Sequence, residues 1–134
     1  MNLLTRKTDY AIRAIVYLAR SSKDVVSSAE LENTLKLPRP FIRKILSLLK
    51  RKRILKSTQG AGGGFTLSLP PEKIFLVDLM KIFQVKVSLS ECLFKKKICP
   101  DIKTCPLRGK IKDIEGLVNQ ELESVTIATL LEGT

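Results

Sequence analysis

The sequence contains no histidine and no tryptophan, and aromatic residues make up only 5% of it. Histidine is the side chain that enzymes use most often as a general acid or base, so its absence removes the commonest catalytic group. No other acid–base pair stands beside a candidate nucleophile. These absences argue against catalysis, and we expect a protein that is not an enzyme.

Long hydrophobic runs are also missing. No stretch approaches the ~20 apolar residues of a membrane-spanning helix, and charged residues interrupt the first 20 positions. We find no secretory signal, and we therefore expect a cytoplasmic protein with no membrane partner. With 134 residues, 44% of them hydrophobic, the chain can bury a core without a disulfide scaffold.

Acidic residues are absent between Glu32 and Glu72, although the whole chain carries a net charge of +11. Lysine and arginine crowd into that interval, whereas beyond Lys112 there are acids and no bases. A solvated face normally mixes both signs of charge. This single-sign block favours nucleic acid as the partner over a membrane surface or a role in solubility alone.

Apolar spacing predicts two helices in the first part of the chain. The first covers residues 9–20, and Thr8 or Asp9 could cap it. Residues 27–30, Ser-Ser-Ala-Glu, fit a capping box at the start of a second, short helix that ends near Leu35.

A third helix is predicted to begin at Pro40, because proline is well placed at a helix start, and to run to about Lys52. The residues expected to face inward are Ile42, Ile45, Leu46, Leu48 and Leu49. The residues left outside are Arg39, Arg43, Lys44, Ser47 and Lys50. Two short helices joined by a tight turn, the second basic outside, indicate a helix-turn-helix.

Two strand-like runs, residues 54–58 and 65–69, flank the segment Gln-Gly-Ala-Gly-Gly-Gly at 59–64. They predict a glycine-tipped hairpin, the wing of a winged helix. The glycines do not form a phosphate-binding loop, because no Gly-Lys-Ser/Thr ending follows them. Another helix is expected from residue 72 to about 83.

The end of the chain predicts a long helix with an apolar stripe. Its residues are Leu107, Ile111, Ile114, Val118 and Leu122. The stripe could pack on its own domain, but we prefer pairing with a second copy, because a projecting helix must bury that face. Ser124 to Thr126 should break the helix, and a short helix should follow over residues 127–131.

The predicted fold class is therefore mainly α with a small β-hairpin. We expect a winged helix-turn-helix domain over residues 1–71, a linking helix and cysteine loop over 72–106, and a dimerisation helix with a short final helix over 107–134.

The three cysteines, Cys92, Cys99 and Cys105, lie in one short segment, and proline follows two of them directly. In a reducing cytoplasm such thiols bind metal or react more often than they cross-link. Thiolates are the ligands that iron–sulfur clusters require, and prolines keep a loop open around them. A zinc site and inert thiols remain alternatives.

Four features together resemble the Rrf-type family of bacterial winged-helix regulators over essentially the whole chain. They are Thr-Asp-Tyr-Ala-Ile-Arg-Ala at 8–14, Lys-Ser-Thr-Gln-Gly-Ala-Gly-Gly-Gly-Phe at 56–65, the spaced cysteines, and Ser-Val-Thr-Ile-Ala-Thr-Leu-Leu at 124–131. The resemblance implies a homodimeric transcription factor that binds an inverted-repeat operator in double-stranded DNA. It also implies an iron–sulfur cluster, held by Cys92, Cys99 and Cys105, that controls DNA affinity.

The resemblance offers two kinds of residue as the fourth cluster ligand. In IscR-like members a histidine three residues after the last cysteine is the fourth ligand, but this chain has Arg108 at that position. NsrR-like members use a carboxylate at the start of the first helix of the partner subunit, and the matching residue is Asp9. The alternatives are that Asp9 is only a helix-terminal acid, or that the fourth coordination site is left to solvent or a small molecule. Glu91 and Asp101 are weaker candidates for the ligand. The resemblance to NsrR-like members, which use three cysteines and a carboxylate, implies 4Fe–4S rather than 2Fe–2S.

The chain departs from the family pattern at Gln59, where the wing usually offers arginine, and at Arg43 and Lys44, where the family often has Glu-Gln. The operator should therefore differ from those of its relatives. Arg53 replaces a glycine that commonly ends the third helix, so a strained backbone is expected there. The predicted DNA-binding residues are Ser28, Lys36, Arg39, Phe41, Arg43, Lys44, Lys50, Lys52, Ser57, Thr58, Gln59, Gly60 and Gly62. A repressor of the same fold that uses zinc, thiol oxidation or a small ligand is the alternative function.

Overall fold

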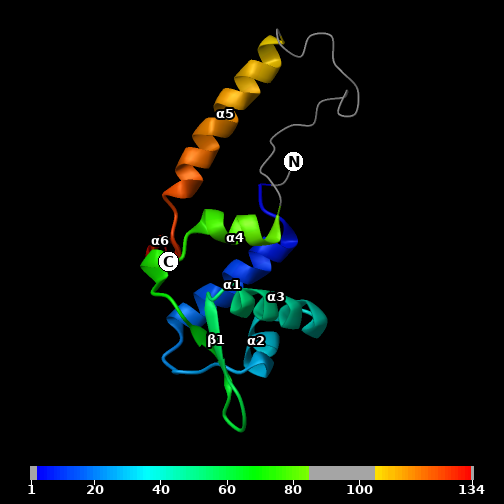
Figure 1. The fold of residues 1–134 in the computed structure, drawn as a ribbon, viewed down its shortest axis with the longest axis vertical. Helices are drawn as coiled ribbons and strands as arrows, with labels where there is room; N and C mark the ends of the chain where they lie inside the picture. Colours follow the sequence, from blue (N-terminus) through cyan, green and yellow to red (C-terminus); the bar gives the residue numbers. More distant parts are fainter. Residues whose placement is uncertain (1–2, 85–104, 134) are drawn as a thin grey trace.

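The computed structural model describes residues 3–84 and 105–133. The elements, in chain order, are α1 (Arg6–Arg20), α2 (Ser28–Leu35), α3 (Arg39–Arg51), β1 (Leu55–Thr58), β2 (Gly64–Leu67), the 3-10 turn η1 (Pro71–Lys73), α4 (Leu76–Phe83), α5 (Pro106–Glu123) and α6 (Ile127–Glu132). The predicted fold class, mainly helical with a small two-stranded hairpin, is confirmed (Figure 1).

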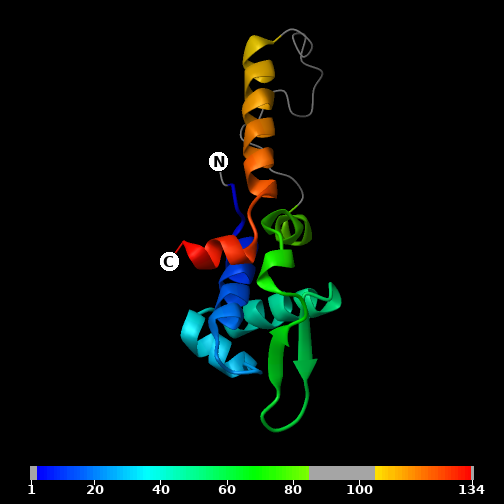
Figure 2. The same ribbon diagram turned by 90° about the vertical axis from the view of Figure 1, so that its left-hand side faces the viewer.

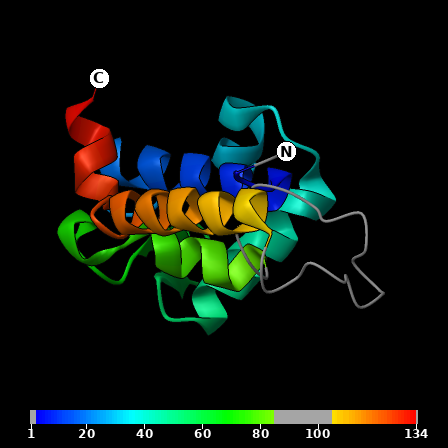
Figure 3. The same ribbon diagram turned by 90° about the horizontal axis from the view of Figure 1, so that it is seen from above.

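Helix α1 lies at the centre of the body and contacts α2, α3, α4, α6 and β2. In Figure 3, α1 and α4 run side by side, and α6 lies across one end of the pair. Ala11 and Ile15 of α1 are fully buried and join Ile42 of α3 and Ile127 of α6 in one apolar cluster. The end of the chain is thus anchored in the same core as its beginning.

The start of α1 differs from the prediction. The helix begins at Arg6 rather than at residue 9, and its N-cap is Thr5, whose Oγ1 accepts a hydrogen bond from the Thr8 backbone N–H at 3.3 Å. Thr8 and Asp9, the predicted caps, lie inside the helix, so the predicted cap was wrong. The first turn is polar and gives no apolar period, so the sequence pattern could not mark it as helix.

Helices α2 and α3 form the predicted helix-turn-helix. Ser27 Oγ accepts from the Glu30 backbone N–H at 3.1 Å, which confirms the predicted cap, although the Glu30 carboxylate pairs with Lys23 instead of closing a capping box. Helix α2 ends where predicted, at a left-handed Lys36 with φ 53°. Helix α3 begins at Arg39, one position before the predicted start, so Pro40 is its second residue.

The hairpin of β1 and β2 forms the predicted wing, and Val26 adds a further bridge to it by exchanging two backbone hydrogen bonds with Phe65. Gly60 and Gly62 adopt left-handed φ values of 95° and 78°, which other residues rarely tolerate. At Gly64 a Cβ atom would lie 2.3 Å from the Val26 carbonyl oxygen, so only glycine fits beside this bridge.

The helix predicted over residues 72–83 ends at Phe83 as expected, but the prediction of one continuous helix was wrong. Ile74 and Phe75 are extended and separate η1 from α4. Phe75 pairs with Thr126, and the Ile74 carbonyl accepts a hydrogen bond from the Ile127 N–H at 2.9 Å. These backbone bonds to a distant segment replace the local bonds that a continuous helix would make.

Helix α5 has 18 residues and is therefore about 27 Å long at 1.5 Å per residue. It projects away from the body, at the opposite end of the molecule from the wing (Figures 1 and 2). Leu122, near the end of α5, is buried with Leu76 and Met80 of α4. The predicted break before a short final helix is confirmed, and α6 follows at Ile127.

Candidate nucleic-acid interface

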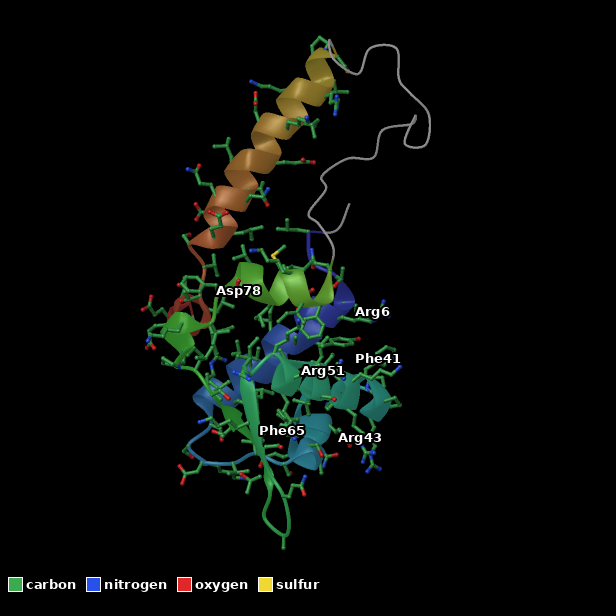
Figure 4. The ribbon with its side chains drawn as sticks, in the orientation of Figure 1. Arg6, Phe41, Arg43, Arg51, Phe65 and Asp78 are labelled. Carbon is green, nitrogen blue, oxygen red and sulfur yellow. The ribbon has the colours of Figure 1, made fainter. Side chains whose placement is uncertain are left out.

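The outer face of α3 and the turn before it present most of the predicted DNA-binding residues to solvent. Those that are exposed are Lys36, Arg39, Phe41, Arg43, Lys44, Lys50 and Lys52, whereas Ser28 is half-buried. In Figure 4, Arg43 extends from α3 away from α1 and into solvent.

The apolar pattern of α3 forces this arrangement. Ile42, Ile45, Leu46 and Leu49 are at most 3% exposed and dock α3 on the core, so the residues between them must face outward. Further exposed cations extend the basic surface beyond the predicted set: Arg51, Arg53 and Lys56. Their place in the acid-free interval was the signal that could have included them.

The wing adds an exposed surface beside the basic helix. Thr58, Gln59, Gly60 and Gly62 are exposed at its tip, and Ser57 is half-buried. Apart from Gln59, the side chains at this tip are small or absent, so its backbone can approach a ligand closely.

An aromatic pair supports the start of α3. Phe41 is 45% exposed, and its ring meets Tyr10 of α1 edge-on, with centroids 6.5 Å apart and an interplanar angle of 72°. Such edge contacts restrict the orientation of a ring. Tyr10 was not among the predicted site residues, because nothing in the local pattern links it to α3.

Two acidic side chains of α2 are paired with cations. Lys23 Nζ donates a hydrogen bond to the Glu30 carboxylate, which lowers the pKa of Glu30 below its ordinary value of 4.5 and raises the pKa of Lys23 above 10.5. Glu32 faces α3 instead, and its Oε1 lies 3.6 Å from Arg39 Nε.

The predicted metal ligands are only partly described. Cys105 is a half-buried free thiol at the N-cap of α5, and its sulfur makes no capping hydrogen bond. Asp9, in the first turn of α1, is 42% exposed and forms an ion pair with Arg13 at 3.0 Å. Cys92 and Cys99 lie outside the described residues. Cys105 directly precedes the projecting end of α5, whereas Asp9 belongs to α1, and Figure 1 shows α1 in the body, away from that end of α5.

Gln84, the C-cap of α4, ties the end of that helix to the start of α1. Its Oε1 accepts hydrogen bonds from the Thr5 N–H at 3.1 Å and from Thr8 Oγ1 at 2.8 Å, and its Nε2 donates to the Leu3 carbonyl at 3.1 Å. Thr8 is fully buried. This contact holds the turn that carries Asp9, and sequence reasoning missed it.

A basic helix-turn-helix followed by an exposed, glycine-tipped hairpin defines a winged-helix protein that binds DNA. Residues 4–133 match the Rrf2 family, whose members are described as iron-dependent transcriptional regulators. The chain belongs to this family, which confirms the resemblance found in the sequence. Rrf2 proteins are DNA-binding transcriptional regulators rather than enzymes.

Individual relatives agree with this assignment. A protein of Aquifex aeolicus, described as a transcriptional regulator of the helix-turn-helix type, is 27% identical over 124 residues, which cover 91% of this chain and 86% of the relative. The transcriptional regulator NsrR of Halalkalibacterium halodurans is 28% identical over 130 residues, covering 96% and 89% respectively.

A solved structure shares the fold along the whole chain. CymR, the global cysteine regulator of B. subtilis, superposes with a TM-score of 0.81 and 23% identity, covering 100% of this chain and 99% of that chain. Across the described parts of the chain, no helix is both long and apolar enough to span a bilayer.

Proposed function

We propose that the protein is a homodimeric regulator that binds an inverted-repeat operator in double-stranded DNA with an affinity set by an iron–sulfur cluster. The main support for DNA binding is the exposed basic face of α3 beside the exposed wing. Functionally, residues 1–71 contact DNA, 72–106 hold the cluster and 107–134 pair the subunits.

Each subunit places α3 in the major groove of one half-site, where Arg39, Arg43 and Lys44 face base edges. Lys50 and Lys52, with Lys36, neutralise phosphates. The wing, at residues 57–64, lies over the adjacent minor groove. Gln59 brings no positive charge to that groove, so most of the electrostatic attraction comes from α3 and its flanks.

Pairing of two α5 helices forms the dimer. Leu107 is 70% exposed, Leu117 is 66% exposed and Ile114 is 40% exposed, so a single chain leaves large apolar side chains of this helix in water. Val118 and Leu122 of the predicted stripe pack toward α4 of their own chain. The pairing face therefore lies on the projecting part of α5, with Leu107, Ile111, Ile114 and Leu117.

The cluster ligands are Cys92, Cys99, Cys105 and Asp9 of the partner subunit. The donor set fits, because Cys105 is a half-buried free thiol at the N-cap of α5 whose sulfur makes no capping hydrogen bond. The separation of Asp9 from Cys105 within one chain supports a ligand from the partner. When bound, an iron–sulfur cluster, 4Fe–4S in preference to 2Fe–2S, would supply a group that oxygen and nitric oxide attack.

The chain's own residues link this site to the DNA-binding body. Arg13 holds the Asp9 carboxylate, and Gln84 joins the end of α4 to the turn that carries Asp9. A ligand that crosses the dimer couples the cluster site to the spacing of the two α3 helices. Loss of that ligand then shifts an equilibrium between two dimer geometries, of which one matches the operator.

A second candidate is thiol chemistry on the same fold, without a cluster. The structural similarity to CymR, a cysteine regulator, and the free thiol of Cys105 favour it. In that case DNA binding follows thiol oxidation, zinc occupancy or a small ligand.

An absorption spectrum of protein purified without oxygen, with iron, sulfide and zinc assayed on the same sample, separates the candidates. The cluster proposal expects a brown protein with iron and sulfide that bleaches with air or nitric oxide. A colourless protein that holds zinc, or no metal after reconstitution, contradicts the cluster and leaves thiol or ligand control.

Replacing Arg39 and Arg43 together with alanine tests the DNA-binding face separately. We expect loss of operator binding with an unchanged absorption spectrum, measured by fluorescence anisotropy. Unchanged DNA binding contradicts the assignment of α3 as the recognition helix.

A further inference from the structure

Given the DNA-binding function proposed above, we propose that Glu32 is a specificity-determining residue that positions Arg39 against a base edge. Glu32 lies on α2, outside the predicted set of DNA-binding residues. It does not itself contact DNA in this arrangement. It acts through the arginine at the start of the recognition helix.

Arg39 is the first residue of α3, and residues at that end of a recognition helix contact bases. Its side chain is 66% exposed, whereas that of Glu32 is only 18% exposed. Glu32 Oε1 is shielded from solvent and has no hydrogen-bond partner among the described residues. The cation that faces this oxygen is Arg39, with Nε 3.6 Å away.

The backbone around Arg39 is already restricted. Pro38 precedes it and Pro40 follows it, and both rings fix their own φ angles. Lys36, at the end of α2, holds a left-handed turn with φ 53°. The remaining freedom at this position is therefore in the long arginine side chain, which has many rotamers in solution.

An ion pair through Nε restrains that side chain and leaves its two terminal amino groups available. A planar guanidinium held in this way matches guanine O6 and N7 with paired hydrogen bonds. Holding the group before binding reduces the entropy lost when the contact forms. Glu32 therefore raises discrimination between base sequences.

The same carboxylate repels phosphates, so it lowers affinity for DNA of any sequence. Loss of its charge should therefore strengthen non-specific binding while it weakens discrimination. Stronger non-specific binding together with weaker discrimination is expected of a positioning residue but not of a purely structural one.

Helix α2 offers a matched control. Glu30 lies one half-turn before Glu32 on the same helix, but it pairs with Lys23 instead of a residue of α3. Glu30→Gln and Glu32→Gln change the net charge equally and keep the side-chain shape. Only the second removes the restraint on Arg39.

The experiment uses the full-length protein. Wild-type protein selects its operator from randomised duplexes, and dissociation constants are then measured for the operator and for a scrambled duplex at several salt concentrations. The ratio of the two constants reports discrimination. The variants are Glu32→Gln, Glu30→Gln, Arg39→Ala and the double variant Glu32→Gln/Arg39→Ala, each checked for folding by thermal melting.

We expect Glu32→Gln to lower the specificity ratio by roughly three- to tenfold, the size of coupling typical of contacting residues. Glu30→Gln should leave the ratio within about twofold, as expected for a site without such coupling. In the Arg39→Ala background Glu32→Gln should have no further effect on the ratio. Glu32→Asp, which keeps the charge on a shorter side chain, should fall between wild type and Glu32→Gln.

Equal ratios for Glu32→Gln and Glu30→Gln would overturn the proposal, as would an undiminished effect of Glu32→Gln without Arg39. If Glu32→Gln melts early, the comparison of Glu32→Asp with wild type, with and without Arg39, decides in the same way. Selection that enriches no sequence contradicts the proposed DNA-binding function instead.

Discussion

Among single residues, Thr8 is a fully buried polar side chain whose hydroxyl donates to Gln84 Oε1 at 2.8 Å. Thr8→Val keeps the shape and removes this donor. We expect a loss of about 1–2 kcal/mol in the free energy of unfolding, the usual cost of an unmade buried hydrogen bond, measured by urea denaturation. The exposed Thr34→Val on α2 is the control, with a change within about 0.5 kcal/mol. Equal effects of both would contradict the role of the Gln84 contact.

A second residue-scale effect is the pH dependence of the pair formed by Lys23 and Glu30. Folding lowers the pKa of Glu30, so its stabilising contribution is present above pH 4.5 and is lost as the pH falls through the lowered native pKa. Folding raises the pKa of Lys23, so the stabilising contribution of Lys23 is present below pH 10.5 and is lost as the pH rises through the raised native pKa.

An NMR titration of the Glu30 carboxyl group tests this pairing. In Lys23→Met we expect the pKa of Glu30 to rise toward 4.5, because the hydrogen bond and the positive charge are removed together. A pKa that is the same in both proteins would mean that Lys23 does not hold this carboxylate in solution.

At the scale of elements, the junction between α3 and β1 carries backbone strain. Arg53 adopts φ 63°, which confirms the expectation that this position suits glycine. Arg53→Gly should stabilise the protein by about 0.5–1 kcal/mol, because left-handed strain of about 1–2 kcal/mol exceeds the added chain entropy. Arg51→Gly, two positions earlier in α3, should instead destabilise by up to about 1 kcal/mol.

Both substitutions remove one positive charge from the basic surface, so DNA affinity should fall similarly in the two variants while their thermal stabilities move in opposite directions. Calorimetry and anisotropy on the same samples check this. A loss of stability in Arg53→Gly would show that the arginine side chain contributes more than the strained backbone costs.

For the whole molecule, the projecting part of α5 is where the proposed dimer forms. Leu107→Glu combined with Leu117→Glu places charges on side chains that are 70% and 66% exposed in one chain. We expect a folded monomer by sedimentation analysis, because a buried, unpaired charge opposes pairing. Leu69→Glu, at a side chain 38% exposed on the body, should remain dimeric. A double variant that stays dimeric would place the interface elsewhere.

Much of the structure of α2, α3 and the wing could be predicted from local patterns in the sequence. The apolar spacing of Ile42, Ile45 and Leu49 identified the buried face of α3 and hence its basic outer face. Ser27 marked the start of α2, and the glycine run marked the wing tip. Each of these signals depends on residues within one or two turns of each other, so it can be recognised in the sequence without knowledge of the fold.

Contacts between distant segments decided the rest. Thr8 bonds to Gln84, 76 residues away, and Ile74 bonds to Ile127, so neither the start of α1 nor the break before α4 has a local signature. Leu107 and Leu122 both belong to the predicted apolar stripe of α5, yet Leu122 is buried while Leu107 is 70% exposed. Periodicity identifies an apolar face, but only the position of α4 determines which of these leucines is covered within the chain.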